Sequence, residues 1–142
     1  MKKAGVLFCS VLFCSLLLAQ SNKDEKEILA ILNQQTVQWN KGDLDNFMSG
    51  YWNNDSLMFI GKSGVTYGYA NTLSNYKKNY SNKDQMGKLF FEIVKMKRLS
   101  PTYYWVLGKW FLKRSVGDIG GSYTLLFGKI NGKWKIIADH SS

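Results

Sequence analysis

The sequence contains one histidine, His140, and imidazole is the side chain best suited to moving a proton near neutral pH. His140 follows the apolar run that begins at Trp134. Strict alternation along a strand places it on the same face as Trp134 and Ile136, which we expect to be the concave, core-facing side. The alternative is a buried histidine bonded to backbone or to a neighbouring helix. Asp139 has the opposite parity and is expected to point away, unless the strand has ended by then.

Among the carboxylates, Asp55 is a second catalytic candidate because it lies just before a short apolar segment that would line a pocket. Its alternative role is that of a turn residue bonded to its own backbone, and Asp43 is best explained as a helix cap. One histidine and the absence of metal-binding or phosphate-binding motifs predict no metal site and no cofactor.

Aromatic side chains are abundant, at 15% of the residues. Six of them could form flat walls with polar tips, which suit a small apolar or aromatic ligand. The alternative is that they simply pack in the core. The six candidates are Trp39, Tyr51, Tyr76, Trp110, Tyr123 and Trp134.

The first nineteen residues resemble a targeting segment. Residues 1–3 are basic at two positions, residues 6–18 are almost continuously apolar, and Ala19 offers a small residue for cleavage. We therefore predict a signal peptide over 1–19, a single domain over 20–142, and export to the periplasm or the medium with no membrane attachment after cleavage. The alternatives are an uncleaved N-terminal anchor and a lipoprotein.

The formal net charge is +9, and removal of Lys2 and Lys3 with the signal lowers it to +7. The lysines are scattered and no nucleic-acid-binding motif accompanies them, so they indicate a solvated surface, and no nucleic-acid partner is expected. Cys9 and Cys14 leave with the signal, which excludes a disulfide from the mature chain. The lipoprotein alternative is weak because a bulky phenylalanine precedes each cysteine.

The elements that must position these residues follow from periodicity. Apolar residues at three- and four-residue spacing predict a helix from Ser21 or Asn22 to about Trp39, and Gly42 ends it. The sequence then predicts a helix over 44–51, a strand over 57–60, a loop over 61–68, a helix over 69–80, a polar linker over 81–87 and a strand over 89–99.

The last third of the chain organises the fold. It holds three aromatic-rich runs, and Asn131-Gly132 between the last two is a strong hairpin signal. The strand over 103–112 is apolar on both faces, so its second face requires cover from the curling sheet or from another subunit. Gly108 within it predicts a bend or bulge. Helices before a meander of long strands indicate an α+β fold.

Several short motifs resemble the nuclear transport factor 2-like superfamily. They are Trp39 with Gly42-Asp43, Tyr51 and Asp55 before Phe59-Ile60-Gly61, Gly68 before Tyr76, Gly108-Lys-Trp110, Tyr123-Thr-Leu-Leu, and Gly132-Lys-Trp134-Lys-Ile136-Ile-Ala-Asp139-His140. The nearest branch is that of the small SnoaL-like domains of unknown function, related in shape to kinase-association domains and ketosteroid isomerases. The resemblance implies a cone, with three helices on a strongly curved antiparallel sheet that encloses a pocket, and a homodimer packed through the sheet.

The family hosts both enzymes and binding modules. The carboxylate base of ketosteroid isomerases would fall at Ile60, so that mechanism does not carry over. We expect an exported domain that binds a small apolar or aromatic ligand as a homodimer. The alternative is an isomerase, cyclase or hydratase with His140 as general acid or base, and the sequence leaves open whether the protein is an enzyme. Both expectations depend on a final strand that lines a hollow with Trp134, Ile136 and His140.

Overall fold

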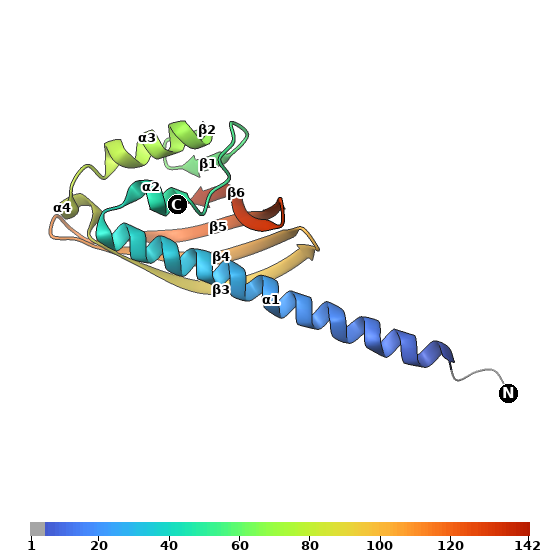
Figure 1. Ribbon diagram of the computed structural model, residues 1–142. Coiled ribbons are helices and arrows are strands. Elements are labelled where there is room, and N and C mark those ends of the chain that lie inside the picture. Colours follow the sequence, from blue (N-terminus) through green and yellow to red (C-terminus); the bar gives the residue numbers. More distant parts are fainter. Residues whose placement is uncertain (1–4) are drawn as a thin grey trace.

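The computed structural model describes residues 5–142, with the side chains of residues 5–19, 21 and 22 left out. Its helices cover one face of a six-stranded curved sheet whose strand order is β2-β1-β6-β5-β4-β3 (Figure 1). This is the predicted α+β architecture. The helices are α1 (Gly5–Lys41), α2 (Leu44–Met48), α3 (Tyr69–Asn79) and α4 (Lys83–Met86). The strands are β1 (Met58–Gly61), β2 (Gly64–Tyr67), β3 (Lys88–Ser100), β4 (Tyr103–Lys113), β5 (Ile119–Ile130) and β6 (Lys133–Ser141).

The four long strands form the predicted antiparallel meander, and β1 then joins β6 in parallel. The predicted loop over 61–68 is wrong, because Gly64 to Tyr67 pairs with β1 as a short hairpin. The run Gly61-Lys62-Ser63-Gly64 indicated a loop and hid the strand. The predicted linker over 81–87 contains α4, whose first turn is capped by the Asn82 side chain.

Helix α1 buries the stripe that its periodicity predicts, with Ile28, Leu32, Gln35 and Trp39 all less than 5% exposed. The helix does not begin at Ser21 or Asn22, because its backbone is continuous from Gly5. The predicted signal peptide spans residues 1–19, whose side chains lie outside the described part of the structure, so it stays a prediction. Within the described part of the chain, no helix has the length and apolar character needed to span a membrane.

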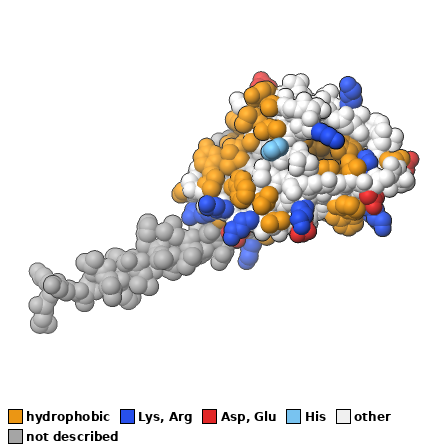
Figure 2. Space-filling view, turned by 180° about the vertical axis from the view of Figure 1, so that it is seen from behind, with side chains coloured by type: hydrophobic (Ala, Val, Ile, Leu, Met, Phe, Trp, Pro, Cys, Tyr) orange, Lys and Arg blue, Asp and Glu red, His pale blue; other side chains and the backbone are white. Residues whose placement is uncertain are grey.

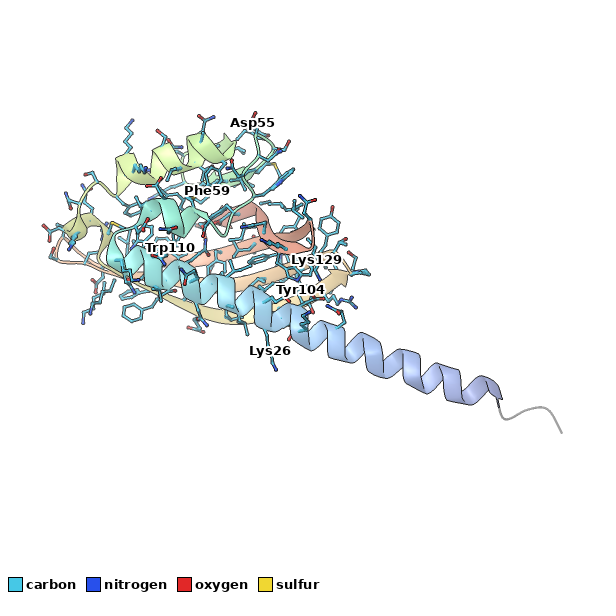
Figure 3. The ribbon with its side chains drawn as sticks, in the orientation of Figure 1. Lys26, Asp55, Phe59, Tyr104, Trp110 and Lys129 are labelled. Carbon is cyan, nitrogen blue, oxygen red and sulfur yellow. The ribbon has the colours of Figure 1, made fainter. Side chains whose placement is uncertain are left out.

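Asp24 connects α1 to the sheet where β5 ends and β6 begins. Its side chain is fully buried, and its Oδ1 accepts hydrogen bonds from Lys129 Nζ at 2.8 Å, Trp134 Nε1 at 3.1 Å and Gln20 Nε2 at 2.9 Å. Lys129 also lies 5.0 Å from the centre of the Trp134 ring. Figure 3 labels Lys129 where β5 passes beside α1. Burial alone would raise the pKa of Asp24, but these bonds outweigh it and the pKa is lowered.

Replacing Asp24 should therefore loosen α1 from the sheet. We expect Asp24→Ala to lower the free energy of unfolding by about 3 kcal/mol, because it leaves Lys129 and the Trp134 N–H without their buried partner. The control Glu27→Gln removes an exposed pair with Lys23 and should cost less than about 0.5 kcal/mol. Urea unfolding measures both.

The same two proteins can be compared by urea unfolding at several pH values. Because the folded-state pKa of Asp24 is lowered, its stabilisation is present above its ordinary pKa of 3.8 and is lost as the pH falls through the folded-state value. The difference between wild type and Asp24→Ala should therefore shrink in acid. A difference that stays constant down to the lowest pH at which both fold would contradict this account.

Candidate ligand-binding site

A cavity of about 700 Å³ lies between the helices and the concave face of the sheet. Its walls are mostly apolar, and Figure 3 shows Phe59 on β1 and Trp110 on β4 at two sides of this region. The aromatic rings that line it are those of Trp39, Phe47, Tyr51, Phe59, Tyr76, Tyr80, Phe91, Trp110 and Tyr123.

A bulge in β6 decides which polar side chain enters this cavity. Phe127 of β5 is opposite Ile136, but Leu126 is opposite Ala138, so Ile137 is an extra residue in β6. The alternation of inward-facing and outward-facing side chains along β6 therefore reverses at Ile137. Asp139 is therefore buried at 3% exposure on the concave side, whereas His140 is exposed. The predicted inward orientation of His140, and the outward orientation of Asp139, are wrong for this reason.

Asp139 is held in a chain of hydroxyl groups. Tyr51 donates its hydroxyl to Asp139 Oδ2 at 2.6 Å, and Ser141 donates to Oδ1 at 2.7 Å. The hydroxyl of Tyr76 lies 3.4 Å from that of Tyr51. Burial raises the pKa of Asp139 to about 6, although the bonds from Tyr51 and Ser141 oppose this shift. A carboxyl group of this kind can exchange a proton near neutral pH.

Two cavity rings each lie over a glycine of the neighbouring strand. A Cβ on Gly108 would meet the ring and hydroxyl of Tyr123, and a Cβ on Gly121 would overlap the Ser142 backbone and lie 3.2 Å from Trp110 Nε1. Gly108 does not itself form the predicted bulge. The irregularity lies in β3 opposite it, between Ile93 and Lys95. Among the described residues, Tyr123 Oη and Trp110 Nε1 are buried without a hydrogen-bond partner.

Five of the six predicted ligand-binding residues line the cavity: Trp39, Tyr51, Tyr76, Trp110 and Tyr123. Whether they bind a ligand stays a prediction. Trp134 does not line it, because its ring packs edge-on against Tyr104 at 5.5 Å and its N–H bonds Asp24. Asp55 is exposed in the turn before β1 and is also outside the cavity lining (Figure 3).

Sequence reasoning missed Asp139, the central polar group of the site. The only sign of the bulge in the sequence is the pair Ile136-Ile137, two adjacent apolar residues that strict alternation cannot place on one face. Within the described part of the chain, no cluster of His, Cys, Asp and Glu has the geometry to hold a metal ion.

Comparison with known proteins identifies the family. No protein-family model matches the sequence, and no curated protein matches it. Among solved structures, an NTF2-like protein of unknown function from Shewanella oneidensis is 43% identical, with 84% of this chain and 98% of that chain covered and a TM-score of 0.80. The chain therefore belongs to the nuclear transport factor 2-like (NTF2-like) family.

More distant structures share the fold. An NTF2-like superfamily protein from Salmonella enterica is 17% identical, covers 86% of this chain and 92% of its own, and has a TM-score of 0.70. A ketosteroid isomerase-like protein from Erwinia carotovora is 16% identical. The match covers 82% of this chain and 93% of that chain, with a TM-score of 0.65. The assignment to the SnoaL-like branch stays a prediction.

Asp139 should make the stability of the protein depend on pH. Its folded-state pKa is raised, so its contribution to stability is fully present below the ordinary pKa of 3.8 and is lost as the pH rises through about 6. The loss is at most about 3 kcal/mol, from a shift of about two pKa units. Asp139→Asn should remove this dependence between pH 4 and 7, which thermal or urea unfolding at several pH values would measure. An unchanged pH profile in Asp139→Asn would contradict the assignment.

Proposed function

We propose that this protein binds a small, largely apolar or aromatic ligand in the cavity between its helices and its sheet. The observation that carries the proposal is a cavity of about 700 Å³ with aromatic walls and one buried carboxyl group. Ligand sites in proteins combine this volume and apolar lining with a small number of placed polar groups. Asp139, with Tyr51 and Ser141, supplies the polar end.

The rings are also fixed in position, which favours binding without reorganisation of the walls. Trp39 contacts Phe47 at 5.2 Å and Tyr80 at 4.8 Å between ring centres, both edge-on, and its N–H bonds the Met86 carbonyl at 3.1 Å. Tyr76 lies 5.6 Å from Phe59. These contacts join α1, α3 and β1 around one space.

A thermal-shift screen of aromatic and lipid-like compounds tests this proposal. We expect a class of compounds to raise the melting temperature. For such a compound, Trp110→Leu should weaken binding about tenfold, because a buried aromatic contact contributes about 1 kcal/mol or more beyond the area it covers. Phe111→Leu, on the opposite face of the same strand, is the matched control and should bind normally. No shift with any compound class would overturn the proposal.

A second candidate function is cofactor-free proton transfer, as in an isomerase, cyclase or hydratase. The observation that favours it is the buried Asp139 carboxyl in the cavity lining, 2.6 Å from the Tyr51 hydroxyl; burial raises its pKa to about 6, which suits a general acid or base at neutral pH. The exposed His140 no longer has the position that the sequence argument required. On a substrate found by screening, Asp139→Asn should abolish turnover and His140→Gln should retain it. The opposite result would restore the histidine mechanism.

We also propose that the outer face of the sheet holds a second copy of the chain. This face is rich in apolar side chains: Tyr103 and Phe111 are 46% and 42% exposed, and Trp105 and Leu107 are half-buried. Figure 2, seen from the side opposite to Figure 1, shows hydrophobic side chains gathered in several groups. Apolar surface of this kind favours association.

Sedimentation of residues 20–142 tests the dimer. Leu107→Glu should convert a dimer to a monomer, because it places a charge at the centre of the proposed contact. Val116→Glu is the matched control in an exposed loop, where Val116 is 59% exposed, and should leave the dimer intact. A wild-type monomer at high concentration would contradict this proposal.

Export with cleavage near Ala19 is likewise a proposal, and N-terminal sequencing of the protein recovered outside the cytoplasm tests it.

A further inference from the structure

We infer that the cavity selects ligands that carry one positive charge, namely a protonated amine or a quaternary ammonium group attached to an apolar body. This inference deepens the proposed ligand-binding function and rests on it. It names the chemical class of the ligand, which the apolar character of the walls alone does not determine.

The first argument is charge. Among the described residues, Asp139 is the only Asp or Glu in the cavity lining, and no lysine, arginine or histidine side-chain nitrogen lies within 4.0 Å of it. The contrast with Asp24 is direct, since that buried carboxylate has the Lys129 ammonium at 2.8 Å. A buried carboxylate without a cation is destabilised in its charged form. A cationic ligand would supply the missing charge.

The second argument is the surrounding aromatic surface. The faces of aromatic rings carry partial negative charge and attract cations within about 6 Å of the ring centre, which makes an aromatic enclosure a natural site for quaternary ammonium groups. Tyr51 and Tyr76 adjoin the carboxylate directly through their hydroxyls. Tyr123 is close enough that the Asp139 charge contributes to raising its pKa. The carboxylate and the rings therefore favour the same kind of ligand.

The positive charges of the protein do not cancel this preference. Of the described lining residues, the basic ones are Lys62 and His140, and both are exposed. Charges in contact with solvent are screened over about 8 Å at physiological salt, whereas a buried carboxylate is screened much less. An anionic ligand would instead have to approach Asp139 against repulsion at close range.

Benzyltrimethylammonium and neopentylbenzene provide a matched pair of probes, because they have the same shape and differ in one positive charge. Calorimetry at pH 7.5 on wild type should show at least tenfold tighter binding of the cation. Asp139→Asn should remove that difference, whereas Asp55→Asn, at an exposed carboxylate outside the cavity, should keep it.

A pH series on the wild type keeps the test valid even if Asp139→Asn fails to fold. Affinity for the cation should fall about tenfold from pH 7.5 to pH 5, as expected for a carboxyl of pKa about 6 that must be ionised. Affinity for neopentylbenzene should not fall. His140→Gln should keep the same dependence on pH, which separates the carboxyl from the imidazole. Burial raises the pKa values of Tyr51, Tyr76 and Tyr123, the tyrosines near Asp139, above their ordinary value of 10 and therefore above this range. Lys62 is the other charged side chain of the described cavity lining.

The outcomes separate this inference from the proposed function. If both probes bind equally, or if the cation preference survives in Asp139→Asn, the charge selectivity is wrong and the apolar ligand-binding function stands. If neither these probes nor any compound of the thermal-shift screen binds, both are wrong.

Discussion

One inserted residue in the last strand determines the chemistry of this protein. Strict alternation from Trp134 would turn His140 toward the helices, but the bulge at Ile137 turns Asp139 inward instead. The buried polar group of the cavity is therefore the Asp139 carboxyl, next to hydroxyls from α3 and from the segment after α2, whereas His140 contributes to the lining from an exposed position. The arguments about charge and proton transfer follow from this change of parity, since the remaining walls are mostly apolar.

Two of the described carboxylates, those of Asp24 and Asp139, are buried, and their surroundings differ. Asp24 has a lysine, an indole N–H and an amide as donors, and its pKa is lowered, so it acts as a fixed connection between α1 and the sheet. Asp139 has two hydroxyl donors and, among the described residues, no Lys, Arg or His nitrogen within 4.0 Å, and its pKa is raised. Burial costs each group free energy, and the Lys129 ammonium offsets part of that cost for Asp24 but not for Asp139. The difference marks Asp24 as structural and Asp139 as available to a ligand or a reaction.

Much of the architecture could be predicted from the sequence because it depends on periodicity and turn chemistry. The stripe on α1, the Asn131-Gly132 hairpin and the four-strand meander all follow local rules. Strand β2 escaped prediction because the run Gly61-Lys62-Ser63-Gly64 indicated a loop, although Val65, Thr66 and Tyr67 favour strands, and pairing with β1 places them in the sheet. At the site, Trp134 was misplaced and Asp139 missed, because a bulge and a helix contact are tertiary features. Five aromatic residues were placed correctly, because a ring on the concave face borders the cavity whatever its exact neighbours are.

The glycines beneath Tyr123 and Trp110 have a consequence for relatives of this protein. The Tyr123 ring has room only because Gly108 has no side chain, and Gly121 leaves room for the Ser142 backbone and, less tightly, for Trp110. A methyl group at Gly108 would push the Tyr123 ring into the interior, and one at Gly121 would displace the end of the chain at Ser142, so either change would alter the space there. The residues aligned with these two glycines should therefore report the capacity of the hollow in other members of the family, before any of their structures is known.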